Sequence, residues 1–111
     1  MSNNYSKEFK YASISLLLDI IQKVNPKENI KYYKFFQKKL NISNDEFESF
    51  KDYKKMTNAE SIDIICKELE YKNHKIMQFL MMLNRCIIID GCELKSYQRF
   101  EDIRDKFLEN F

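Results

Sequence analysis

Apolar residues recur at steps of three and four along almost the whole chain, which is the spacing of an amphipathic α-helix. The first such segment covers residues 5–24, and the last begins near Ser96. Their apolar positions are Phe9, Ala12, Leu16 and Ile20 in the first segment, and Tyr97, Phe100, Ile103, Phe107 and Phe111 in the last. The pattern predicts an all-α protein.

Polar motifs predict where the internal helices begin. Asn25 is a favourable N-cap residue, and Pro26 fits the first position of a helix. Ser43 and Thr57 are each followed three residues later by glutamate, as in a capping box. The three helices after these motifs are predicted to bury Ile30, Tyr33, Phe36 and Leu40; Phe47, Phe50 and Tyr53; and Ile62, Ile65, Cys66 and Leu69.

Residues 74–90 are apolar around most of the circumference of a predicted helix. Only a surrounded helix can hide all of its apolar side chains, which are Phe79, Leu80, Met82, Leu83, Cys86, Ile87 and Ile89. Gly91 can take the left-handed conformation that ends such a helix. We therefore predict a single helical domain over residues 1–111, a compact bundle of about six helices around this central one.

Composition excludes several classes of function. The 111 residues include one Gly, one Pro and one His, and the net charge is only +2. One glycine is too few for a phosphate-binding loop, and one histidine excludes most hydrolase and zinc sites. A net charge this close to zero is not typical of a dedicated nucleic-acid-binding protein.

The cysteines and the apolar runs bear on the compartment. Cys66, Cys86 and Cys92 form no CxxC pair, and we find neither a signal peptide nor an apolar run that could span a bilayer. These features predict free thiols and a cytoplasmic protein.

Catalysis is not expected from the remaining candidates. A nucleophile needs a base within hydrogen-bond reach and a third group to orient it. Ser61 and Ser96 lie near predicted helix starts, where serine is an ordinary polar or capping residue. Glu101 and Asp105 lie one turn apart on the polar face of the last helix. The sequence therefore predicts neither an enzyme nor a cofactor.

Three segments resemble the tellurite-resistance TerB-like family. Residues 16–26 are similar to that family's first helix and turn, residues 40–46 to its next helix end and acidic start, and residues 79–91 to its second long helix with a closing Asp-Gly turn. The resemblance implies an all-helical single domain with a non-enzymatic role, often in stress-response or phage-defence systems near membranes.

The acidic turns of TerB-like proteins have been suspected of binding divalent metal. Here Asn25-Pro26 lacks the carboxylate in the first turn, and the second turn offers only Asp90 and Glu93. Calcium takes six to eight oxygen ligands, which two carboxylates cannot supply. His74 and Cys86 are separated by about 18 Å along a helix, so they cannot share an ion. We predict no metal site; one would have to use Asp90 and Glu93.

Lysines line one face of the second predicted helix. They are Lys27, Lys31, Lys34 and Lys38, at steps of four, three and four. Such spacing places side chains on one helix face. Tyr32 and Phe35 are expected at the edge of this face, because the core stripe of the helix is already complete. Aromatic anchors beside lysine stems form a plausible protein-binding surface.

The leading prediction is a non-enzymatic helical domain that binds another protein or a second copy of itself. In a homodimer the acidic residues of the last helix, Glu101, Asp102, Asp105 and Glu109, would complement the lysine face. The alternative is a small helical regulator that binds nucleic acid or an acidic partner through the same lysines. Nucleic-acid binding is the less favoured reading, because no arginine precedes Arg85 and arginine is the preferred residue for bidentate recognition.

Overall fold

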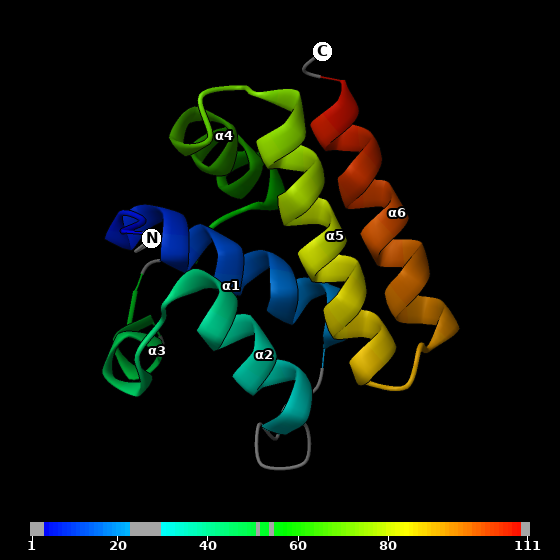
Figure 1. Cartoon of the computed structure of the whole chain (residues 1–111), viewed down its shortest axis with the longest axis horizontal. Coiled ribbons are helices and arrows are strands. Elements are labelled where there is room, and N and C mark those ends of the chain that lie inside the picture. The colour runs from blue at the N-terminus through cyan, green and yellow to red at the C-terminus, as the bar shows by residue number, and fades with distance from the viewer. Residues whose placement is uncertain (1–3, 23–29, 51, 54, 110–111) are drawn as a thin grey trace.

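The structure, a computed structural model, describes residues 4–22, 30–50, 52–53 and 55–109. These residues form six helices and no strand, which confirms the all-α prediction (Figure 1). The helices are α1 (Lys7–Ile21), α2 (Ile30–Leu40), α3 (Asn44–Phe50), α4 (Asn58–Glu68), α5 (Asn73–Ile89) and α6 (Leu94–Leu108). The predicted start at Asn25-Pro26, Lys27, the side chain of Ile30 and Phe111 lie outside the described residues.

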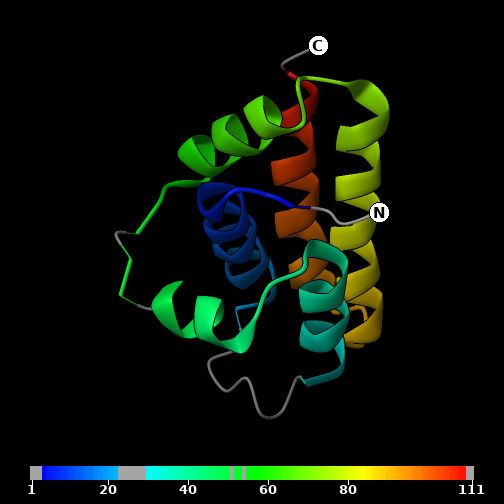
Figure 2. The same cartoon turned by 60° about the vertical axis from the view of Figure 1, so that its left-hand side comes forward.

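The central helix is α1, not the helix at 74–90 as the sequence predicted. α1 packs against α3, α4 and α6, and α5 passes beside it, where the ring centroids of Phe9 and Phe79 are 5.8 Å apart. Both views place α1 in the middle of the bundle (Figures 1 and 2). The buried positions of α1 cover most of its circumference: Phe9, Lys10, Tyr11, Ala12, Ser13, Ile14, Leu16, Leu17, Ile20 and Ile21.

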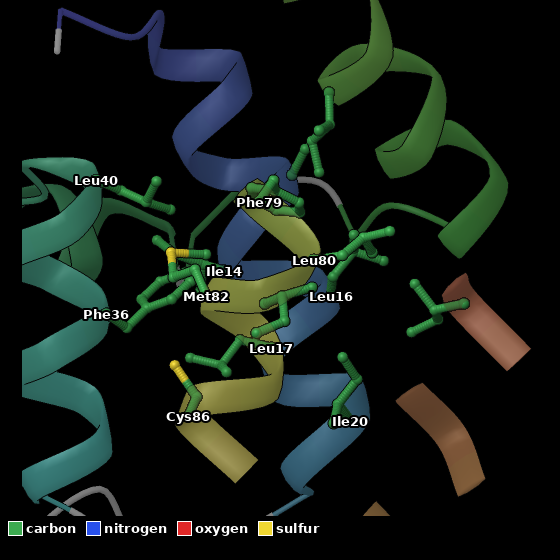
Figure 3. Close-up of a cluster of buried hydrophobic side chains, with 14 of the residues drawn as sticks. Ile14, Leu16, Leu17, Ile20, Phe36, Leu40, Phe79, Leu80, Met82 and Cys86 are labelled. Atoms are coloured by element: carbon green, nitrogen blue, oxygen red, sulfur yellow. The ribbon is translucent and has the colours of Figure 1, made fainter. Parts of the chain in front are cut away.

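α5 is covered on one side only. Six of its seven predicted core residues are buried, and Ile89 is half-buried. Met77, Met81 and Ile88 are nevertheless exposed at 48%, 66% and 45%. Figure 3 shows the buried side of α5 against α1, with Leu80 and Met82 near Leu16 and Ile14. The prediction failed because apolar composition alone does not show whether a helix is covered on every side, and this helix leaves two methionines and Ile88 exposed.

Two capping boxes form as predicted. Thr57 and Glu60 exchange side-chain and backbone hydrogen bonds at the start of α4. At the start of α3, Ser43 N–H donates to Glu46 Oε1 at 2.9 Å and Glu46 N–H donates to Ser43 Oγ at 3.0 Å. The same Glu46 carboxylate accepts from Lys10 Nζ at 2.9 Å, so this cap also fastens α3 to the central helix.

The ends of the other helices agree less closely with the prediction. α5 ends as expected: Gly91 has φ +105°, and the Cys92 N–H donates to the Ile87 carbonyl at 2.9 Å, as in a Schellman motif. α6 begins at Leu94, two residues before the predicted Ser96. α3 ends at Phe50, so Tyr53 lies beyond it and is 42% exposed instead of buried.

The core position of Leu83 can be tested by truncation. Leu83 is fully buried, so Leu83→Ala leaves a cavity and should lower the free energy of unfolding by about 2–5 kcal/mol in a urea titration. Met77→Ala, on the exposed side of the same helix, should cost less than about 0.5 kcal/mol. A loss below about 0.5 kcal/mol in Leu83→Ala would contradict this packing.

The Glu46 contacts predict a defined acid sensitivity. The Ser43 amide and, after it, the Lys10 ammonium lower the pKa of Glu46 below its usual range. The stability that these two contacts give to the folded protein should therefore be fully present above about pH 5. It should be lost as the pH falls below the usual glutamate pKa of about 4.3. Glu46→Gln should be less stable than wild type at pH 7, and the gap should close towards pH 3 in thermal melts. Asp45→Asn, in the same helical turn, should keep the wild-type profile; a gap independent of pH would contradict this assignment.

Candidate functional site

An open groove of about 890 Å³ lies between α2 and α5, and we name it the α2–α5 groove. The two helices pack against each other, as Figure 2 shows. The lining residues are Asn4, Tyr5 and Phe9 near the start of the chain, Phe35, Lys39 and Leu40 of α2, Glu68 and Leu69 at the end of α4, and His74, Lys75, Gln78, Phe79, Met81, Met82 and Arg85 of α5. Segments distant in sequence therefore form one concave surface.

The floor and walls of the groove are largely apolar. Phe79, Leu40 and Met82 are buried at its base, where they join the main core. Figure 3 shows Leu40 of α2 and Met82 of α5 pointing toward one another across this base. Above it, Met81 is 66% exposed and Phe35 is half-buried. A flexible thioether and an aromatic ring in the same groove give an apolar surface that can adapt to a partner.

The charged lining of the groove is mainly basic. Lys39 Nζ lies 5.7 Å from the centroid of the Phe35 ring, and neither Lys39 nor Arg85 has a carboxylate partner among the described residues. Lys75 pairs with Glu70 at 3.4 Å. Glu68 is the only acidic residue among the described lining residues, and both of its oxygens accept hydrogen bonds from Ser6, at 2.9 and 3.1 Å. The groove therefore presents unpaired positive charge on both walls, Lys39 on α2 and Arg85 on α5.

The predicted lysine face only partly coincides with the groove. Lys31, Lys34 and Lys38 are exposed on α2, as expected, and Phe35 lines the groove. The lysine that accompanies Phe35 in the lining is Lys39, one turn further along α2, rather than one of the predicted set. The other three described lysines extend the positive charge of α2 beyond the groove.

The predicted role of Tyr32 as a surface anchor is wrong, because Tyr32 is only 4% exposed. Its burial, with the nearby Asp90 and Cys86, raises the pKa of Tyr32 to about 12. Tyr33, predicted to be in the core, is half-buried, and its ring centroid lies 4.5 Å from that of Phe47 on α3. α2 is rotated relative to the expected orientation, so that both tyrosines pack inward and only Phe35 remains at the edge.

Sequence reasoning missed Met81 and Arg85, because both lie on the helix that was expected to be surrounded. A signal was present in the polar residues of that helix. His74, Gln78 and Arg85 follow one another at steps of four and seven, which places them on one side of a helix. All three are exposed and all three line the groove.

The other candidate chemistry is not assembled by the fold. Among residues 4–22, 30–50, 52–53 and 55–109, no three His, Cys, Asp or Glu side chains gather into a possible metal site. Ser61 and Ser96 are fully buried. Cys66 and Cys86 are buried and Cys92 is exposed, all as free thiols, and burial raises the pKa of Cys86 to about 12. A buried, protonated thiol is a poor nucleophile.

Comparison of the chain with protein-family models, with curated proteins and with solved structures found no match. The similarity to TerB-like proteins therefore rests on the sequence pattern of residues 16–26, 40–46 and 79–91. In the described part of the chain, no helix combines the length and the apolar character that crossing a membrane requires.

The turn with Asp90 and Glu93 can be tested directly for metal binding. Asp90 is half-buried at the end of α5, and Glu93 is exposed at the N-cap of α6. Because two carboxylates are too few for a hard cation, millimolar calcium or micromolar zinc should leave the melting temperature unchanged. A saturable rise that disappears in Asp90→Asn would contradict this expectation.

Proposed function

We propose that this protein is a non-enzymatic protein-interaction domain and that the α2–α5 groove is its binding surface. The observation that carries the proposal is that the exposed Met81 and the half-buried Phe35 line the same groove as Lys39 and Arg85, two cations without a carboxylate partner among the described residues. Methionine, aromatic and arginine side chains are enriched in protein interfaces, and interface anchors are usually apolar groups within a polar rim.

The composition of the groove favours a protein over a nucleic acid. Its floor is apolar, so a phosphate backbone lying in it would lose water without gaining equivalent contacts. Its described lining contains a single arginine, and arginine is the preferred residue for bidentate recognition of phosphates and base edges. We therefore interpret the lysines of α2 as the charged rim of an apolar interface. The same lysines make nucleic acid the second candidate ligand.

A second copy of the chain is one possible partner, as the sequence suggested. The acidic residues of α6 would face the groove of the other copy in such a homodimer. Arg104 Nη2 already lies 3.2 Å from Asp105 and 3.8 Å from Glu101, whereas Asp102 and Glu109 have no ion pair among the residues that the structure describes. A role in stress response or phage defence is proposed on the resemblance to TerB-like proteins alone, and a cytoplasmic location on the three cysteines without a CxxC pair.

Site-specific photocrosslinking in cells tests the proposal. Met81 is exposed, so benzoylphenylalanine in its place should not disturb the fold, and illumination should produce a discrete adduct with another protein. Arg85→Glu should reduce the adduct yield by about tenfold, because it removes an interface cation. The control carries the same group at Lys95, an exposed position on α6 outside the groove.

The identity of the adduct decides the result. An adduct of two chains would identify a second copy as the partner, and an adduct with a different protein would identify an external one. An adduct with nucleic acid alone, or no protein adduct specific to position 81, would overturn the proposal.

A further inference from the structure

We infer that the partner presents an acidic amphipathic helix of about three turns to the α2–α5 groove, an inference that rests on the proposed function. It follows from three properties of the groove: its length along α5, its lack of a free strand edge and the arrangement of its charges around an apolar centre.

The length of the groove matches a short helix. Its α5 wall runs from His74 to Arg85, and eleven steps of 1.5 Å give about 17 Å. A helix of about 12 residues has that length and places three apolar side chains on one face, at positions i, i+3 or i+4, and i+7. The α2 wall is shorter, because only Phe35, Lys39 and Leu40 of α2 line the groove, so the bound helix would lie mainly along α5.

The backbone of the groove favours a helix over an extended peptide. Extended peptides bind mainly by pairing with the edge of a sheet. Apart from Asn4 and Tyr5, which precede α1, and Leu69, which follows α4, the lining residues lie on helices, whose interior N–H and C=O groups are already bonded within each helix, and the described residues contain no strand. A bound helix satisfies its own backbone, so it needs only side-chain contacts from the groove.

The charges specify an acidic helix. Lys39 stands on the α2 wall and Arg85 on the α5 wall, so carboxylates on both flanks of a central apolar stripe would each meet a cation. In the described part of the chain neither cation has a carboxylate partner, and the one acidic residue of the lining there, Glu68, is bonded to Ser6. Met81 and Phe35 would cover the apolar stripe between the two cations. Basic flanks on the helix would place like charges together, which disfavours binding.

Selection from a peptide library tests the inference without a known partner. The probe is a displayed library of 12-residue helix-forming peptides, selected on the full chain at physiological salt. The recovered peptides should be net negative and carry apolar residues at i, i+3 or i+4, and i+7. Their affinities are then measured by fluorescence anisotropy, with a 12-nucleotide oligothymidylate as a separate ligand.

Two matched pairs of variants locate the binding. Met81→Ser should weaken binding by about tenfold, and Met77→Ser by less than about twofold, because both methionines are exposed on α5 but only Met81 lines the groove. Arg85→Glu should weaken binding by a similar factor, and Lys95→Glu on α6 should have little effect. All four positions are exposed, so unchanged melting temperatures confirm that the fold is intact.

The possible failures are distinguishable. Recovered peptides that are neutral or basic but still sensitive to Met81→Ser would overturn the acidic helix and leave the proposed function standing. Peptides insensitive to both groove variants would remove the groove as the binding surface and with it the proposed function. If the selection enriches no peptide, the inference is overturned. Crosslinking from position 81 then remains an independent test of the proposed function. If oligothymidylate binds more tightly than any peptide and Met81→Ser does not change its affinity, the ligand of this surface is a phosphate backbone and the acidic helix is overturned.

Discussion

The covering of α1 on nearly all sides determines where the other helices can lie. Leu16 and Leu17 are adjacent and both completely inaccessible to solvent, and adjacent helical positions point about 100° apart. One neighbouring helix cannot hide both, and in the structure α3, α4 and α6 pack around α1 while α5 lies beside it. α2 then packs chiefly on α5, and the groove forms where α2 and α5 meet above the start of α1. The groove is thus a consequence of how the core is closed.

The helices could be predicted from the sequence because their signals are local. Periodicity revealed six amphipathic segments, and the pairs Ser43–Glu46 and Thr57–Glu60 marked two starts that the structure confirms through hydrogen bonds. The identity of the central helix could not be predicted in this way. Both α1 and α5 are rich in apolar residues, and the exposed Met77 and Met81 are apolar by composition although they lie outside the core.

The groove depends on long-range packing, which a single sequence does not show. It combines Phe9, Phe35 and Arg85, residues on three helices that no spacing rule connects. The lysines of α2 were recognisable from their spacing, but the rotation of α2 was not. That rotation is set by contacts with α3 and α5, which bury Tyr32 and leave Phe35 at the edge. Only the polar residues His74, Gln78 and Arg85 indicated in advance that one side of α5 is open.

The most direct measurement of groove occupancy is the NMR signal of the methionine methyl groups during titration with an acidic amphipathic peptide. The chain has five methionines, of which Met81 and Met82 line the groove and Met77 lies on the same helix outside it. A peptide bound between α2 and α5 should shift the Met81 and Met82 signals and leave Met77 nearly unchanged. Shifts at Met77 with Met81 unaffected, or no saturable shift at any methionine, would contradict binding in the α2–α5 groove.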